Sequence, residues 1–126
     1  MRRVAGAAIL IGVLGTAVAC SDDRASPDTA LTPAGQHGYE VARDNGCFAC
    51  HGDGGMNGVA ATWKGLYGSQ VALGDGTSVT ADEAYLTESI TAPSAKISAG
   101  ATLAMPANRL DAEQIAAVID YIEELR

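Results

Sequence analysis

The segment "GCFACHGDGG" at residues 46–55 brings Cys47, Cys50 and His51 close together in the sequence. The chain has three cysteines and two histidines in all, so this segment holds three of its five thiol and imidazole groups. Four interpretations suit such a segment: covalent attachment of haem, a zinc site, thiol–disulfide exchange, or a chance grouping. The rest of the sequence has to decide among them.

Haem attachment fits the spacing best. A closed zinc site needs four ligands, and only His37 would remain as the fourth. A thioredoxin-like redox pair needs a βαβ context, which the sequence lacks. In C-x-x-C-H, by contrast, two thiols on one turn of backbone can add to both vinyl groups of a porphyrin, and the histidine then lies beneath the iron. We therefore predict one covalent haem c on Cys47 and Cys50, with His51 as an axial iron ligand.

Residues 1–20 have the features of an export signal. Two arginines precede an uncharged apolar run, residues 4–19, which is marginally short for a membrane span and has no stop-transfer flank. The run ends in "AVAC", which resembles a bacterial lipoprotein cleavage site and implies that Cys20 is lipidated. Ordinary cleavage, with Cys20 removed or left free, is the alternative. We expect a protein anchored by lipid on the periplasmic side of a bacterial membrane.

The charge of the chain limits its partners. The formal net charge is −7, and without the two arginines at positions 2 and 3 it becomes −9, from six basic and fifteen acidic residues. Such an acidic chain is a poor ligand for nucleic acid. It favours protein partners with a basic docking face.

Composition divides the remaining chain into two parts. Residues 21–32, "SDDRASPDTALT", are polar and predict a flexible linker. Residues 33–126 predict one domain, which starts with a helix over residues 33–46 after Thr32 as its N-cap. A short hairpin is expected around residues 75–76.

Two further helices follow. A capping box of Thr80 and Glu83 predicts the start of a helix in "ADEAYLTESITA", which Pro93 stops. Asp111 is predicted to cap a last helix with one apolar stripe, formed by Ile115, Val118, Ile119, Ile122 and Leu125. Long loops with few aromatic residues make a self-sufficient core improbable, and a large apolar cofactor would supply what is missing.

Residues 33–126 resemble a class I c-type cytochrome, most closely the cytochrome c domain of haem-copper oxidase subunit II. The resemblance is carried by "GCFACHG", "TWKGLYGS", "DGTSVTADEAYLTESI", "AMPA" and "IAAVIDYIEEL". It implies an all-α cytochrome c fold, with three main helices and long loops wrapped around one haem. It also implies an electron-transfer protein rather than an enzyme, without a small-molecule substrate.

The second axial ligand follows from the same resemblance. Met105 and Pro106 match the family's "MP" motif, which implies that the Met105 sulfur binds the iron opposite His51. Met56 is too close to His51 in sequence to cross to the other face, and His37 is expected to face solvent. A thioether raises the potential and fills the coordination sphere, so neither peroxide nor oxygen could bind.

The resemblance also implies a haem pocket. Trp63 and Tyr67 are expected near the propionates, with the indole N–H or phenol O–H donating to them. Ala60-Ala61 replaces the usual Gly-Pro pair, and we expect the Ala61 carbonyl still to accept the His51 ring N–H. The apolar residues expected to line the porphyrin are Leu66, Leu86, Ile90, Ile97 and Leu103.

A second departure concerns the first helix. Ala42 stands where the family commonly has a bulky aromatic residue, so we expect packing against the last helix to depend on Gly38 meeting Tyr121.

The sequence thus predicts a membrane-tethered one-electron carrier with His/Met ligation in a respiratory chain. The alternative is an electron-transfer subunit held permanently in an oxidase or dehydrogenase complex. A ligand-binding or peroxidase-like haem protein would need an open iron site.

Overall fold

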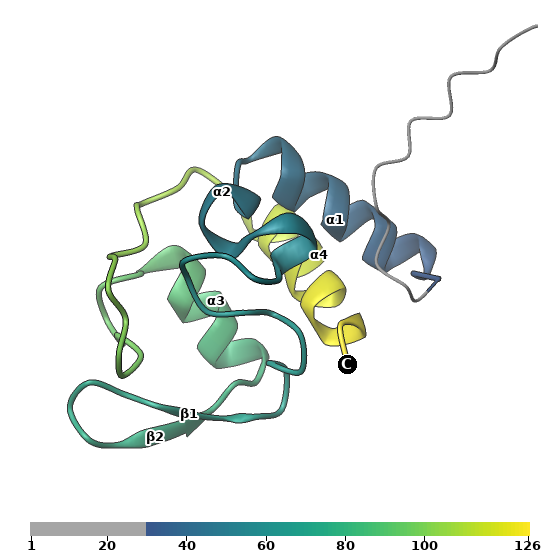
Figure 1. Cartoon of the computed structure of the whole chain (residues 1–126). Coiled ribbons are helices and arrows are strands. Elements are labelled where there is room, and N and C mark those ends of the chain that lie inside the picture. The colour runs from purple at the N-terminus through teal and green to yellow at the C-terminus, as the bar shows by residue number, and fades with distance from the viewer. Residues whose placement is uncertain (1–29) are drawn as a thin grey trace, which may run out of the picture.

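The computed structural model describes residues 30–126. The predicted signal peptide, the predicted lipidation at Cys20 and the predicted linker up to residue 29 lie outside the described residues. None of the helices in the described range is long and apolar enough to span a bilayer. In chain order the elements are α1 (Pro33–Asp44), α2 (Phe48–His51), the 3-10 turn η1 (Asp53–Gly55), β1 (Gln70–Ala72), β2 (Ser78–Thr80), α3 (Glu83–Thr91) and α4 (Ala112–Glu124) (Figure 1).

The architecture agrees with the predicted cytochrome c fold: mostly helical, with α1 and α4 packed together and long loops between the other elements (Figure 1). The three expected main helices are α1, α3 and α4, and the single turn of α2 adds a fourth that the sequence did not predict.

Both long terminal helices start where their capping residues predict. Thr32 Oγ1 accepts a hydrogen bond from the Gly35 amide at 3.2 Å, and Pro33 is the first helical residue. Asp111 accepts from the Gln114 amide at 2.9 Å while the Gln114 side chain accepts from the Asp111 amide, which makes a complete capping box. The predicted N-caps of α1 and α4 are therefore confirmed.

A glycine lets α1 and α4 approach closely. A Cβ on Gly38 would collide with the Ala117 carbonyl of α4 and lie 2.8 Å from Tyr121 Cβ. The Tyr39 ring packs edge-on against the Tyr121 ring, with 5.5 Å between centroids, and Ala42 is completely buried. The predicted meeting of Gly38 with Tyr121 is confirmed.

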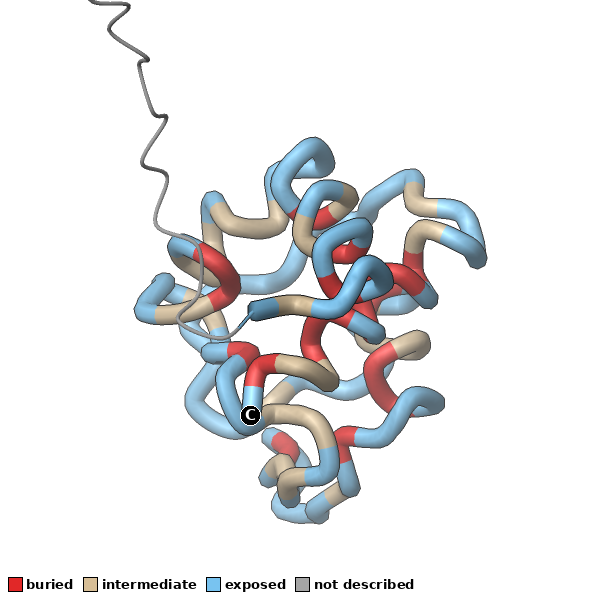
Figure 2. Tube along the Cα trace, turned by 90° about the vertical axis from the view of Figure 1, so that its right-hand side faces the viewer, coloured by how far each residue is buried: buried red, intermediate tan, exposed pale blue. Residues whose placement is uncertain are grey.

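The core lies mainly between the helices. Figure 2 shows the buried segments toward the interior of the molecule and exposed loops around them. The predicted stripe of α4 is buried throughout, as are Leu86 and Ile90 of α3. Burial of these side chains is worth about 1.5–3 kcal/mol each. They pack with residues of the other elements, chiefly Ala42, Trp63, Leu73, Ala81 and Tyr85.

The predicted hairpin is present, but the start of α3 differs from the prediction. β1 and β2 pair antiparallel with Val71 opposite Val79. Thr80, the predicted cap, belongs to β2, where its hydroxyl accepts from the Gln70 side chain at 2.8 Å. Asp82 caps α3 instead and accepts from the Tyr85 amide at 2.9 Å. The predicted capping box is wrong because strand pairing occupies Thr80, and because an aspartate two residues later is as good a cap.

Candidate haem-attachment site

The one-turn helix α2 positions the two thiols and the imidazole. The His51 amide donates to the Cys47 carbonyl at 3.1 Å, and the Cys50 amide donates to the same carbonyl at 3.3 Å. Residues three apart on a helical turn face the same way, so this turn can direct both sulfurs to one ligand. Both cysteines are half-buried and free, and burial raises the pKa of the Cys47 thiol. Two reduced thiols on one turn suit thioether formation.

The His51 ring is fixed by a backbone carbonyl. Its Nδ1 lies 2.8 Å from the Ala61 oxygen, the hydrogen bond predicted from the sequence. A carbonyl can only accept, so Nδ1 must carry the proton, which leaves the lone pair of Nε2 for a metal. The ring also lies against Trp63, with 4.8 Å between centroids. Replacement of the family's proline by alanine does not remove this contact.

Close backbone approach holds Ala61 in place. The Ala60 amide donates to the Cys50 carbonyl at 2.9 Å, so the chain returns directly to α2. A Cβ on Gly58 would collide with the Cys50 oxygen and the His51 carbonyl carbon. Only glycine at position 58 lets the backbone come this close to α2. The segment "GVAA", residues 58–61, thereby places the Ala61 carbonyl beside the His51 ring.

Trp63 and Tyr121 connect this site to the helices. Trp63 is buried, and its ring lies 5.8 Å from Phe48 and 6.2 Å from Tyr121 between centroids. The Tyr121 hydroxyl donates to the Gly54 carbonyl at 2.8 Å. Burial, with smaller effects of Tyr39 and Asp53, raises the pKa of Tyr121 to about 12, so the hydroxyl stays a donor at neutral pH. The sequence did not identify this hydrogen bond, which no local pattern signals.

The residues expected to line the porphyrin divide into two groups. Leu86 and Ile90 are buried and Leu66 is half-buried, as parts of the core. Ile97 and Leu103 are instead 53% and 59% exposed. Val59, which the sequence analysis missed, is 67% exposed in the segment just after the attachment turn. Its only sequence signal is a large apolar residue among glycines and alanines.

The fit to a haem depends on the attachment turn. Two free thiols on one helical turn, and a His51 ring whose Nε2 is left for a metal, are the groups that covalent haem attachment needs. The exposed Val59 lies on a different loop from Ile97 and Leu103, and no described contact joins the three. The roles of Ile97 and Leu103 against a porphyrin stay predictions.

The other predicted site residues lie apart from α2 in the sequence and are not joined to it by a described contact. Met105 lies in the long loop between α3 and α4 and is 36% exposed. Tyr67 is half-buried and packs against the core. Their roles toward a haem, and that of Trp63 toward its propionates, stay predictions.

The competing ligands occupy other places. Met56 is half-buried in the loop after α2, with its methyl group near Gly54, and His37 is exposed on α1. Within residues 30–126 no group of three or more histidine, cysteine or acidic side chains could hold a metal ion. No described contact joins His37 to the cysteines, so the described residues give no support to the zinc interpretation.

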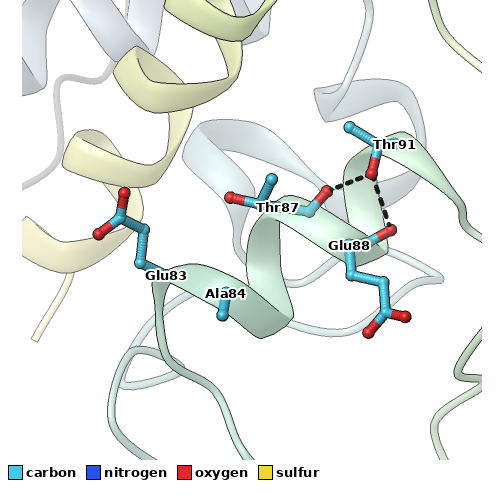
Figure 3. Close-up of a pocket in the computed structure, with 5 residues that line it drawn as sticks. All are labelled: Glu83, Ala84, Thr87, Glu88 and Thr91. Carbon is cyan, nitrogen blue, oxygen red and sulfur yellow. Dashed lines mark hydrogen bonds between the residues drawn. The ribbon is translucent and has the colours of Figure 1, made fainter.

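A separate hollow lies on the outer face of α3 (Figure 3). It is lined by Glu83, Ala84, Thr87, Glu88 and Thr91. Thr91 bonds back to the Thr87 carbonyl at 2.8 Å, and the Glu88 carboxylate pairs with Lys96. None of the predicted site residues lines this hollow, which adds acidic surface rather than a cofactor site.

Comparison with known proteins agrees with this geometry. The family model described as "Cytochrome c" matches residues 35–126, nearly the whole of the described chain. A search of curated proteins gave no significant match.

Proposed function

The chain belongs to the cytochrome c family, and on that premise we propose that it is a one-electron carrier of a respiratory chain, tethered to the periplasmic side of a bacterial membrane. A cytochrome c domain implies covalently bound haem c and a role in electron transfer. The haem supplies iron that gains and loses one electron. The chain's own residues hold that group, set its potential and limit access of water and other ligands.

Three residues of one turn would bind the haem from one side. Cys47 and Cys50 would form the two thioethers and His51 the first axial bond. The proposal depends above all on one observation, the 2.8 Å contact between His51 Nδ1 and the Ala61 carbonyl, because it leaves Nε2 as the metal-binding nitrogen.

We assign the second axial position to Met105. Its support is the "MP" sequence and its place in a partly exposed loop, in contrast to half-buried Met56. A neutral, soft thioether favours ferrous over ferric iron and raises the potential. If His51 and Met105 both held the iron, no position would be left for small ligands, which favours electron transfer over catalysis.

The test compares the two methionines of the mature chain. In Met105→Ala, the methionine-to-iron absorption band should vanish, the potential should fall, and carbon monoxide should bind the ferrous protein readily. In the matched control Met56→Ala, all three should stay as in the wild type. Equal behaviour of the two variants would refute Met105 as the ligand. Loss of colour from the polypeptide in acidified organic solvent would refute covalent attachment.

The acidic surface supports partners with a basic docking face. Glu83 and Glu88 lie on the outside of α3, and Asp120 is exposed on α4. Opposite charges speed association at low ionic strength, so electron transfer with a natural partner should slow as salt is added. A rate independent of salt would contradict this part of the proposal.

The tether would leave the domain at a fixed point. The Thr32 amide donates to the Glu124 carboxylate at 2.9 Å, so the start of α1 is held at the end of α4. Leu31 packs on the core and Thr32 caps α1, so the proposed tether is residues 21–30, which as a flexible chain would span about 17 Å on average. A lipid on Cys20 would thus keep the carrier near the membrane surface.

A permanent subunit of an oxidase or dehydrogenase is the rival, and the resemblance to oxidase subunit II makes a terminal oxidase the partner to test first. Solubilised membranes decide between the two. Release of a monomer that separate partners reduce and reoxidise supports the carrier, and co-purification with an oxidase through detergent and salt supports the subunit.

A further inference from the structure

The loop between α3 and α4 is held at few points. Residues 101–109 are all exposed. The first half of the loop is joined to the hairpin, where Ser98 forms a bridge with Leu73 and the Ala99 amide donates to the Ala72 carbonyl at 2.8 Å. Over residues 102–110, which we name the Met105 segment, the hydrogen bonds described all involve one side chain, that of Asn108.

Asn108 makes two hydrogen bonds, one through the nitrogen and one through the oxygen of its side-chain amide. Its Nδ2 donates to the Ile90 carbonyl at 2.6 Å, and its Oδ1 accepts from the Leu110 amide at 3.2 Å. The first contact is long-range, because the two partners lie eighteen positions apart in the sequence. The second is local and shapes the entry to α4.

The Ile90 carbonyl needs such a donor. The last carbonyls of a helix have no amide within the helix to bond. α3 ends at Thr91, and no backbone amide of the described residues donates to the Ile90 carbonyl. Ile90 is itself buried in the core, so its carbonyl belongs to a rigid part of the molecule. Asn108 thus ties the Met105 segment to that rigid part.

We propose that Asn108 is a positioning residue for Met105, three residues before it. The amide fixes the C-terminal side of the Met105 segment to the end of α3, while the Ser98 bridge fixes the preceding part of the loop to the hairpin. Because both sides of the loop are anchored, the backbone around Met105 has less conformational entropy to lose when the Met105 sulfur binds iron. The proposal rests on the function proposed above, in which Met105 is the axial ligand.

The experiment measures how easily imidazole displaces methionine from the ferric holoprotein. In Asn108→Ala, the apparent imidazole affinity should rise roughly three- to tenfold, the ratio that one hydrogen bond supplies, and the potential should fall. Asn108→Asp keeps the acceptor for Leu110 but loses the donor to Ile90, so it should behave like Asn108→Ala.

The matched control is Asn45→Ala. Asn45 Nδ2 donates to the Val41 carbonyl at 2.9 Å at the end of α1, the same type of bond at a different helix. The Asn45→Ala variant should have the imidazole affinity and the potential of the wild type. The inference is overturned if Asn108→Ala binds imidazole as the wild type does, if Asn108→Asp does so, or if Asn45→Ala has an equal effect.

One further variant separates this inference from its premise. Met105→Ala should bind imidazole more tightly than either asparagine variant. If it binds no more tightly than the wild type, the axial assignment itself fails. If Met105→Ala responds and Asn108→Ala does not, only the role of Asn108 fails.

Discussion

The α1–α4 pair and the Met105 segment are secured in opposite ways. The two helices meet across buried side chains and a glycine contact so close that a methyl group would not fit. The Met105 segment is exposed up to Arg109, packs against the core only through Leu110, and is bonded through one asparagine side chain. Packing therefore fixes the α1–α4 pair, which we call the frame. The position of Met105, the residue assigned to the iron, depends instead on polar contacts and on the cofactor.

This contrast has a consequence for local stability. The helix pair contacts the attachment turn directly, because the Phe48 ring of α2 packs against Tyr39 of α1 and Tyr121 of α4. The Met105 segment has few contacts of its own, so its local opening should cost less free energy than opening of the helix pair.

Hydrogen exchange in the holoprotein should show the largest difference between the two regions. Amides in the middle of α4, such as that of Val118, should exchange only by global unfolding, which for domains of this size costs about 5 kcal/mol or more. The Met105 and Leu103 amides have no described acceptor and should exchange close to the rate of an open chain. Equal protection of both regions would contradict the contrast.

Gly38→Ala tests how far the helix pair depends on close approach. The added methyl group would meet the Ala117 carbonyl, which cannot rotate away, so we expect a loss of about 3 kcal/mol in the free energy of unfolding. Gly35 of the same helix is the control. A methyl group there meets the tip of the Glu124 side chain, which can move. Denaturant unfolding should rank Gly35→Ala clearly above Gly38→Ala in stability, and the reverse ranking would refute the packing argument.

Sequence reasoning worked where the physical cause is local. The caps at Thr32 and Asp111 and the apolar stripe of α4 depend on residues within one or two turns, and the structure agrees with them. The C-x-x-C-H spacing likewise implies its chemistry without a fold. The contact of Ala61 with His51 was predictable only through the family resemblance.

Contacts between residues far apart in the sequence were either not predicted or predicted wrongly. Thr80 satisfies the capping pattern, but its pairing across the hairpin with Gln70 decides its role. Asn108 reaches Ile90 over a loop without periodicity, and Tyr121 reaches Gly54 across much of the chain. Ile97 and Leu103 are apolar, and only the course of the loop between α3 and α4 shows that both are exposed in the chain itself. Their place against a porphyrin stays a prediction.

Tyr121→Phe should have the next largest effect on stability. It keeps the ring in the α1–α4 contact but leaves the Gly54 carbonyl without its donor, which costs about 1–2 kcal/mol at a buried site. Tyr39→Phe is the control, because the Tyr39 hydroxyl has no described hydrogen bond. Thermal unfolding of the two holoproteins makes the comparison. If Tyr39→Phe costs as much as Tyr121→Phe, the hydroxyl of Tyr121 does not join α4 to the turn beside the haem site.

The smallest expected effect lies at the far end of the helix pair, where Glu124 meets Thr32. Hydrogen bonds from the Thr32 hydroxyl and amide hold the pKa of the Glu124 carboxyl below its ordinary value of 4.5. A lowered folded-state pKa stabilises the protein above the unfolded-state pKa, and the stabilisation is lost as pH falls through the folded value. Glu124→Gln should therefore lower the unfolding temperature at pH 7 by a small amount, and the difference from the wild type should shrink as the pH falls below 4.5 and the folded carboxyl becomes protonated.

The matched control for this pH dependence is Asp120→Asn, one turn earlier on α4, an exposed carboxylate with no described hydrogen bond. Both variants remove one negative charge from the same helix, so a general charge effect would change their unfolding temperatures alike. A pH-dependent loss in Glu124→Gln alone identifies the contact with Thr32 as its cause. A parallel loss in both would mean that the start of α1 is held by its own Thr32 cap and by packing on α4, and that the Glu124 carboxylate adds nothing to the frame.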